Sequence, residues 1–402
     1  MTRRIAICAA VLSALLIGVS TRCARRTFAQ QNAAPPPLAG AAIARFAHGG
    51  NAAEVPSDFS GGLIFLPVRI NDGQPSLFEL DSTAAVSSIS PNRAMELGVA
   101  NVPSPVLNLT GLFLSLPSLP ENDKSDFEPE VGRPYQGTLG ADLFARVVVE
   151  LDYARQTVRL LDPAGYEYSG AGKTFHLAFD GGMPVVQAKL KVAGKTLDGN
   201  FIVNTALAEP VLVSSHVAEA HHLSVSHVKT VAIADDLDAT AEASEGRLTE
   251  FQIGPFTVES VLMEFSKGKL PGTGDPKVVG EIGGGMLRRF NLTFDYERQQ
   301  IIFDPDSEFH ADDNENMSGL SIIASGSNLK TFVVTQVRSG TPASEAGIQK
   351  GDEIAGVDEE PAADLSLVAV RDLFRQVGHS YKLLIERNGQ AHTVTIRMRR
   401  LL

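Results

Sequence analysis

The chain has 402 residues, of which 44% are hydrophobic and 20% charged, and this length and composition allow two or three folded domains while excluding a single small module or a largely disordered protein. Its 36 glycines and 22 prolines indicate many turns and favour a β-rich fold. The formal net charge is −12 at pH 7, and because such a surface repels phosphate backbones and anionic lipids, no nucleic-acid partner is expected.

Residues 1–29 have the pattern of a secretory signal peptide. Arg3 and Arg4 precede an uncharged apolar run over residues 5–19, and Ala29 stands at a suitable cleavage position. The run is shorter than the roughly 20 residues of a membrane-spanning helix, so no membrane span is expected after cleavage, although an uncleaved signal would act as an anchor. The chain is therefore predicted to be exported, either to the periplasm or as a secreted protein.

The signal peptide also determines the chemistry left in the mature chain. Cys8 and Cys23 both fall within it, so neither a disulfide nor a thiol nucleophile is expected afterwards. Its removal would delete five arginines and no acidic residue, which moves the formal charge from −12 to −17. Residues 30–57 follow; they are rich in Ala, Pro and Gly without a sustained period, and this composition predicts a flexible linker.

An internal duplication then predicts two lobes, over residues 58–166 and 167–308. In each unit, short alternating apolar runs are bounded by turn residues, as in strands joined by tight turns. Each unit has a polar residue where such a strand ends, Asp81 in the first and Asn204 in the second. The other matching positions are Gly62 and Gly182, Gly140 and Gly283, and Asp152-Tyr153 and Asp295-Tyr296.

A short helix is predicted after the polar residue in both units. In the first, residues 90–98 have helical spacing, with Ser90 as the N-cap and Gly98 as the stop. In the second, residues 214–223 have similar spacing and include three histidines. Because these histidines lack the His-Glu-x-x-His spacing and a third ligand, no metal or cofactor is expected.

The pattern changes after an acidic linker at residues 309–316. Residues 317–402 contain three Gly-rich motifs, an amphipathic helix near residues 365–378 and two final strands, which predict a separate module. The motifs are Gly340-Thr341-Pro342-Ala343, Ala346-Gly347-Ile348 and Gly351-Asp352-Glu353-Ile354.

The duplicated unit resembles the pepsin and retropepsin clan of aspartic proteases, in particular bacterial retropepsin-like proteins that carry a C-terminal PDZ domain. The resemblance covers residues 59–308 and includes the later family element twice, as Thr138-Leu139-Gly140 and Glu281-Ile282-Gly283. It implies a mainly β, two-lobed acid-protease β-barrel fold formed by internal duplication, plus an α+β PDZ domain. In that family each lobe contributes one carboxylate, and the close pair shares one proton during amide hydrolysis.

Both catalytic triplets depart from the Asp-Thr/Ser-Gly pattern of the family. The first lobe has Asp81-Ser82-Thr83, and the second has Asn204-Thr205-Ala206. The acid and a hydroxyl are thus retained in the first lobe, whereas the second loses the acid, and both lose the glycine. The resemblance implies that Ser82 and Thr205 brace the two loops across the lobe interface. Asn204 does not titrate, so it cannot hold the shared proton.

The C-terminal motifs resemble those of bacterial PDZ domains, which bind an extended peptide as an added strand and hold its terminal carboxylate with loop amides. Ser318 stands where the family usually has an apolar residue. The residues that the resemblance assigns to the peptide groove are Gly319, Leu320, Ser321 and Ile322 on the loop and strand, and Val368 and Arg371 on the helix.

Together these features predict an exported aspartic-protease-like PDZ protein that is catalytically impaired and binds an extended polypeptide or a protein C-terminus. One alternative is an active aspartic endopeptidase with an atypical dyad, which would use Asp81 alone or pair the Asp81 lobes of two molecules. Another is a non-catalytic scaffold whose PDZ domain makes protein–protein contacts. For the groove itself, a PDZ domain that packs only against its own lobes stays open. The oligomeric state is not predicted.

Overall fold

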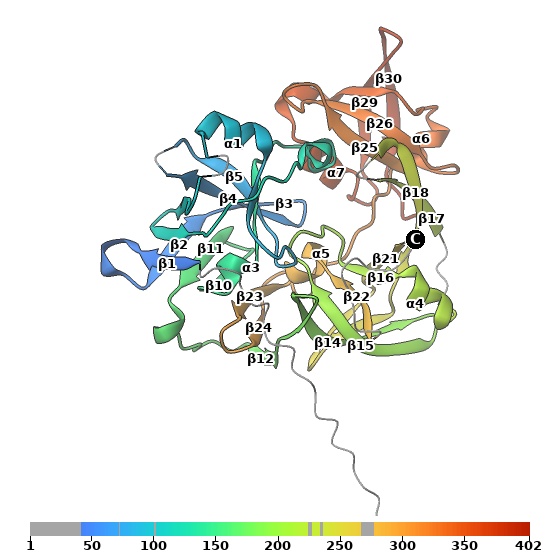
Figure 1. Ribbon diagram of the computed structural model, residues 1–402. Coiled ribbons are helices and arrows are strands. Elements are labelled where there is room, and N and C mark those ends of the chain that lie inside the picture. The colour runs from blue at the N-terminus through green and yellow to red at the C-terminus, as the bar shows by residue number, and fades with distance from the viewer. Residues whose placement is uncertain (1–41, 72, 100–101, 224–226, 234–235, 267–276) are drawn as a thin grey trace, which may run out of the picture. The chain divides into compact units, whose positions relative to one another are not determined.

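The computed structural model describes residues 42–71, 73–99, 102–223, 227–233, 236–266 and 277–402, with 227–233 and 236–244 given by their backbone alone (Figure 1). The predicted signal peptide, residues 1–29, lies outside the described residues. Among the helices of the described residues, none is both long and apolar enough to cross a membrane.

Lobe 1 is built around a sheet of order β1-β8-β7-β4-β5-β9-β6, with β3 paired to β4. The predicted helix after the site is present, since Ser90 accepts a hydrogen bond from Arg93 N and Gly98 ends the helix at φ +61°. The strands are β1 (Ile43–Phe46), β2 (Ala52–Pro56), β3 (Asp58–Ser60), β4 (Leu63–Ile70), β5 (Ser76–Leu80), β6 (Ser88–Ile89), β7 (Val106–Leu109), β8 (Leu112–Ser115), β9 (Gly137–Leu139), β10 (Val148–Asp152) and β11 (Thr157–Leu161). The helices are α1 (Pro91–Leu97), α2 (Glu128–Val131) and α3 (Ala141–Phe144), with 3-10 turns η1 (Ala47–Gly49), η2 (Ser125–Phe127) and η3 (Pro163–Gly165).

Lobe 2 repeats this plan in a sheet of order β17-β18-β21-β16-β22-β15-β14-β19-β20, with β13 paired to β14. Its strands are β12 (Lys173–His176), β13 (Ala178–Asp180), β14 (Met183–Val192), β15 (Lys195–Val203), β16 (Val211–Ser214), β17 (His227–Ile233), β18 (Asp236–Arg247), β19 (Glu250–Ile253), β20 (Phe256–Glu259), β21 (Leu262–Ser266), β22 (Val278–Ile282), β23 (Phe290–Asp295) and β24 (Gln300–Pro305). Its helices are α4 (Ser215–Ala220) and α5 (Gly284–Leu287).

A third sheet joins the lobes, in the order β12-β24-β23-β10-β11-β2. At its centre β10 and β23 run antiparallel, and Glu150 pairs with Thr293. These two strands end at Asp152 and Asp295, which the sequence comparison matched to each other. Equivalent strands of the two copies therefore lie side by side, as expected when two duplicated units pair through the same strand.

Each lobe has the same arrangement of three paired strands beside its polar residue. In lobe 1, β9 runs parallel to β5 and antiparallel to β6; in lobe 2, β22 runs parallel to β15 and antiparallel to β16. Asp81 N donates to Leu139 O over 3.0 Å, and Asn204 N donates to Ile282 O over 2.9 Å. The predicted fold class, mainly β with two duplicated lobes, is confirmed.

The predicted flexible linker at residues 30–57 is wrong in its second half. β1 pairs with β8, and β2 pairs with β11, with Val55 opposite Val158. Ala53 and Val55 are buried while their neighbours are exposed, so a period-two apolar pattern inside a segment of low-complexity composition was sufficient to add two edge strands.

The C-terminal domain has its own sheet and its own core, as predicted. The sheet order is β25-β26-β27-β29-β30, with β28 paired to β27, and a buried apolar cluster separate from that of the lobes extends from Met317 to Met398. Its elements are β25 (Leu320–Ser325), β26 (Thr331–Val337), β27 (Glu353–Val357), β28 (Glu360–Pro361), β29 (Ser380–Arg387), β30 (Gln390–Arg397), α6 (Pro342–Glu345), α7 (Leu367–Leu373) and the 3-10 turn η4 (Ala362–Asp364).

The acidic linker at residues 309–316 is held firmly rather than solvated. Glu315 is 1% exposed; it forms an ion pair with Arg247 and accepts a hydrogen bond from Leu401 N. Asp313 accepts a hydrogen bond from Leu262 N at 2.9 Å. These contacts tie the lobes to the C-terminal domain through carboxylates whose charge is satisfied by specific donors.

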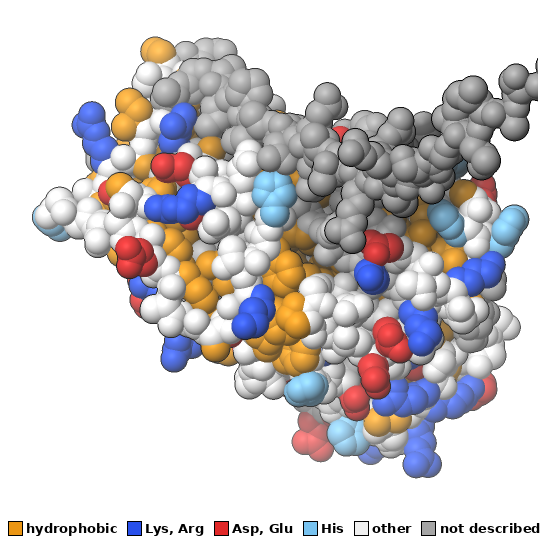
Figure 2. Space-filling model, turned by 90° about the horizontal axis from the view of Figure 1, so that it is seen from below, with side chains coloured by type: hydrophobic (Ala, Val, Ile, Leu, Met, Phe, Trp, Pro, Cys, Tyr) orange, Lys and Arg blue, Asp and Glu red, His pale blue; other side chains and the backbone are white. Residues whose placement is uncertain are grey.

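The molecular face seen from below in Figure 2 has Lys and Arg side chains interspersed with Asp and Glu. Apolar side chains gather toward the middle of this face. The net negative charge of the chain is therefore not concentrated there.

Candidate functional site

Two hydroxyl side chains lock the loops that follow β5 and β15. Ser82 N donates to Thr205 Oγ1 over 2.9 Å, and Thr205 N donates to Ser82 Oγ over 3.1 Å. The hydroxyls themselves donate to the carbonyl groups of Val203 and Leu80, over 2.6 Å and 2.5 Å. Both side chains are fully buried. These four hydrogen bonds join the loop that carries Asp81 to the loop that carries Asn204.

The carboxylate of Asp81 is used by its own loop. Asp81 Oδ1 accepts hydrogen bonds from Thr83 N at 2.8 Å, Thr83 Oγ1 at 2.6 Å and Ala84 N at 3.1 Å. The Thr83 hydroxyl thus saturates the oxygen that the loop amides already hold. Thr83 does not have a positive φ, so the change from glycine adds a side chain without backbone strain.

The carboxamide of Asn204 is held on both sides. Asn204 Oδ1 accepts a hydrogen bond from Ala206 N over 2.9 Å, and Nδ2 donates to Glu281 Oε2 over 2.6 Å. Ala206 also lacks a positive φ. The side chain therefore keeps the turn that an acid would stabilise, but it carries no proton that could be transferred.

Two buried glutamates lie beside these loops, and sequence reasoning missed the role of both. Glu79 is 5% exposed, and burial followed by the charge of Asp81 raises its pKa to about 7, although Lys124 lowers it. Glu281 is 7% exposed, and its pKa is raised. Burial is the main cause and the charge of Asp81 acts in the same direction, while the hydrogen bond from Asn204 acts against them. The available signal was one glutamate in an otherwise apolar strand, as in "SLFEL" and "VVGEI".

Tyr135 completes the polar surroundings of the first loop. Its ring is 3% exposed and lies 5.4 Å from that of Phe65. Burial, then the charges of Glu79, Glu128 and Asp81, raises the pKa of its hydroxyl. Across the described residues, no group of three or more His, Cys, Asp or Glu side chains is arranged to hold a metal ion. The site thus offers carboxyl groups, an amide and hydroxyls.

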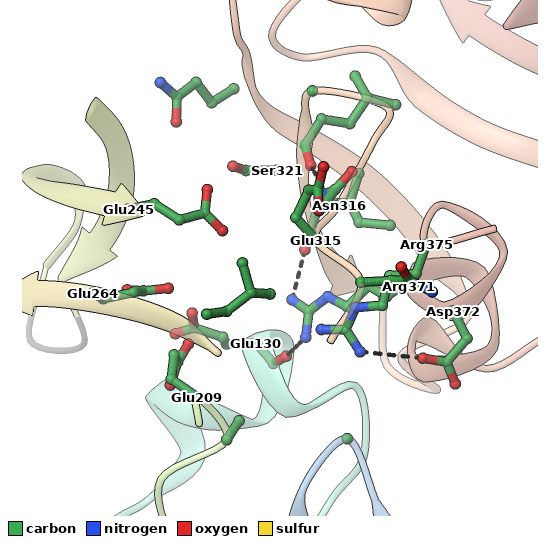
Figure 3. A pocket seen from close by; sticks show the side chains of 18 of the residues that line it. Glu130, Glu209, Glu245, Glu264, Glu315, Asn316, Ser321, Arg371, Asp372 and Arg375 are labelled. Atoms are coloured by element: carbon green, nitrogen blue, oxygen red, sulfur yellow. Dashed lines mark hydrogen bonds and ion pairs between the residues drawn. The ribbon is translucent and has the colours of Figure 1, made fainter. Parts of the chain in front are cut away.

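A cavity of about 260 Å³ lies beside β25 and α7 of the C-terminal domain. All six residues predicted for the peptide groove line it: Gly319, Leu320, Ser321, Ile322, Val368 and Arg371. The opposite wall comes from the lobes and includes Glu130, Glu209, Glu245 and Glu264 (Figure 3). Sequence reasoning found the wall on the C-terminal domain but not the wall on the lobes.

Arg371 connects three elements across one end of this cavity. Its Nη2 donates to Ile322 O in β25 and its Nη1 to Glu130 O in α2, both over 2.8 Å. Next to it, α2 packs against β25, and a Cβ added to Gly132 would lie 2.5 Å from Leu367 Cβ in α7. A segment of lobe 1 therefore covers the end of the groove that Arg371 occupies.

Comparison with known proteins identifies the C-terminal domain. The family model of the PDZ domain matches residues 312–398. The chain carries a PDZ domain. Its β25 edge and α7 are the elements that flank a PDZ peptide groove, so a capacity for peptide or protein binding follows from the domain type.

Two solved structures show similarity to parts of the chain. One is the photosystem II D1 C-terminal processing protease, with 28% identity over 21% of this chain and 23% of that chain at a TM-score of 0.20; the chain thus spans less than a quarter of it. The other is an aspartic proteinase from Irpex lacteus, with 12% identity over 65% of this chain and 99% of that chain at a TM-score of 0.38. A search of curated proteins found no match.

Proposed function

We propose that this chain is an exported polypeptide-binding protein with an aspartic-protease-like body whose site no longer performs hydrolysis. Amide hydrolysis by two carboxyl groups needs one ionised group to activate water and one protonated group to supply a proton. The single observation that carries the proposal is the fixed amide of Asn204, because it fills the second position with a group that cannot titrate.

The state of Asp81 supports the same conclusion. Three donors converge on one of its oxygens, and one of them is the Thr83 hydroxyl. An acid that accepts three hydrogen bonds from its own loop acts as a turn cap. The retained activity would then be binding, through the interface between the lobes, the PDZ groove or both.

A second candidate is an active endopeptidase with an atypical pair formed by Asp81 and Glu281. The observation that favours it is the buried carboxyl group of Glu281, which is bonded to the amide of Asn204 and whose pKa is raised. Such a group could supply the proton that Asn204 cannot. This candidate requires acid-dependent turnover that is lost when either carboxyl group is removed.

Binding and turnover can be separated in one experiment. The purified chain is incubated with a mixture of unstructured peptides at several pH values between 3 and 8, and mass spectrometry measures both the retained peptides and any new termini. The proposal predicts saturable retention of intact peptides without new termini. New termini that disappear in Asp81→Ala and in Glu281→Gln would instead establish the second candidate, and absence of saturable retention would favour a scaffold.

A further inference from the structure

The loop before β25 leaves few amides for a terminal carboxylate. Ser318 N donates to Asn316 Oδ1 over 3.0 Å, and Leu320 N donates to Ser318 Oγ over 3.0 Å. The Ser318 hydroxyl in turn donates to Asn316 Oδ1 over 2.6 Å. The amides on either side of Gly319 are therefore bonded inside the loop. Capture of a terminal carboxylate needs amides that point at the ligand. The amides of Ser318 and Leu320 are not available for that purpose.

The strand edge beyond the loop is suited to main-chain pairing. β25 is an outer strand of its sheet, and Ile322 O points toward α7, where it accepts the hydrogen bond from Arg371. An edge carbonyl that accepts a cationic donor from its own chain can equally accept an amide from an added strand. Pairing along an edge does not require that the added strand be a chain terminus.

The cavity next to this edge has an excess of negative charge. Six carboxyl side chains and three guanidinium groups line it, and one of the six, Glu315, is paired with Arg247 from outside the lining. Arg375 is paired with Asp372 at 3.3 Å, and Arg338 with Glu245 at 3.7 Å, while Arg371 donates to two backbone carbonyls. Figure 3 shows Glu209, Glu245 and Glu264 reaching toward the space from the side opposite Arg371 and Arg375.

From these three observations we propose that the PDZ groove binds an internal, extended segment of a polypeptide and places a Lys or Arg side chain of that segment among the carboxylates of the cavity. The internal hydrogen bonds of the loop disfavour the carboxylate of a C-terminus, the outer edge of β25 supplies main-chain pairing once Ile322 O is released from Arg371, and the carboxylates supply charge complementarity. This inference rests on the proposed polypeptide-binding function and specifies the ligand of one of its sites.

The test uses the full chain and defined peptide pools. Fluorescein-labelled ten-residue peptides are made with Lys, Ala or Glu fixed at a central position, each as an amide and as a free carboxylate, and binding is followed by fluorescence anisotropy. We expect the Lys pool to bind about tenfold more tightly than the Glu pool, because the central Lys is attracted by the carboxylates of the cavity and a central Glu is repelled by them. Amidation of the C-terminus should leave the affinity unchanged.

Two variants locate the binding in the groove. Glu209→Lys should weaken binding of the Lys pool about tenfold, whereas Glu359→Lys, an exposed position on a turn of the PDZ domain, serves as a matched control and should not. Ser318→Ala removes the acceptor of Leu320 N, and the freed amide should create a preference for the free carboxylate that the unmodified chain lacks.

The outcomes separate this inference from the function on which it rests. If the unmodified chain binds only peptides with a free carboxylate, or binds the Lys and Glu pools equally, the inference is overturned while polypeptide binding stands. If Glu209→Lys and Glu359→Lys behave alike, the binding site is elsewhere and the inference also fails. If no pool binds saturably, both the inference and the proposed function fail.

Discussion

Asn204 Nδ2 donates a 2.6 Å hydrogen bond to Glu281 Oε2, so the acid bonded to the second site residue lies on the neighbouring strand instead of on the loop. The matching position in lobe 1 is Thr138, whose buried hydroxyl has no hydrogen-bond partner. The two copies have therefore diverged in opposite ways. One keeps an acid on the loop beside a hydroxyl on the strand, and the other has an amide on the loop beside an acid on the strand.

The hydroxyl brace should be a major determinant of stability. Ser82→Ala removes the donor to Val203 O and the acceptor of Thr205 N, both fully buried, and it should lower the free energy of unfolding by about 2–4 kcal/mol. Urea denaturation measures the change. Thr257→Val, at an exposed position on β20, is the control. Equal stability of the two variants would show that the brace contributes nothing.

The pKa of Glu79 predicts a pH dependence with a definite sign. Because burial raises this pKa from 4.5 to about 7, the folded state binds the proton more strongly than the unfolded state, so this contribution to stability is complete below pH 4.5 and is lost as the pH rises to 7. The loss is about 3 kcal/mol. Glu79→Gln stays neutral, so its stability relative to the unmodified chain should increase by up to that amount between pH 4 and pH 8.

Urea denaturation at those two pH values tests this dependence. Glu54→Gln, an exposed glutamate on β2, should show the same pH profile as the unmodified chain. A Glu79→Gln profile parallel to that of the unmodified chain would mean that Glu79 ionises normally.

Arg371 should stabilise β25 in the free protein by linking it to α2. Arg371→Met keeps the bulk of the side chain but removes the donors to Ile322 O and Glu130 O, and amide hydrogen exchange in β25 should become about tenfold faster or more. Arg375→Met, one turn further along, removes only an exposed pair with Asp372 and should leave β25 unchanged. Identical protection of the β25 amides in both variants would show that the hydrogen bonds of Arg371 do not stabilise this strand.

Much of the architecture could be predicted because duplication repeats its own signals. The matched pairs Asp152 and Asp295, and Gly140 and Gly283, fix the same strands in both copies, and the hairpin and helix boundaries follow from turn residues and caps such as Ser90. Local composition was misleading at Ala53 and Val55, because a strand at the edge of a sheet is stabilised by its partner β11, which lies about a hundred residues away in the sequence.

The site was only partly predictable for the same reason. Ser82 and Thr205 follow from the family pattern, and so do the groove residues of β25 and α7. The partners of Asn204 do not, because Glu281 comes from a strand 77 residues later and its sequence context indicates only a buried strand. The covering of the groove by α2 depends on the packing of lobe 1 against the PDZ domain, for which no local sequence signal exists.

The central claim is that the amide at position 204 keeps the site silent. The unmodified chain, Asp81→Ala, Asn204→Asp and Asn204→Asp with Asp81→Ala are incubated with the same peptide mixture at acid pH, and new termini are counted by mass spectrometry. The account predicts new termini with Asn204→Asp alone, since only that variant has an acid on both loops. Cleavage by the unmodified chain that equals that of Asn204→Asp and disappears in Asp81→Ala would contradict it.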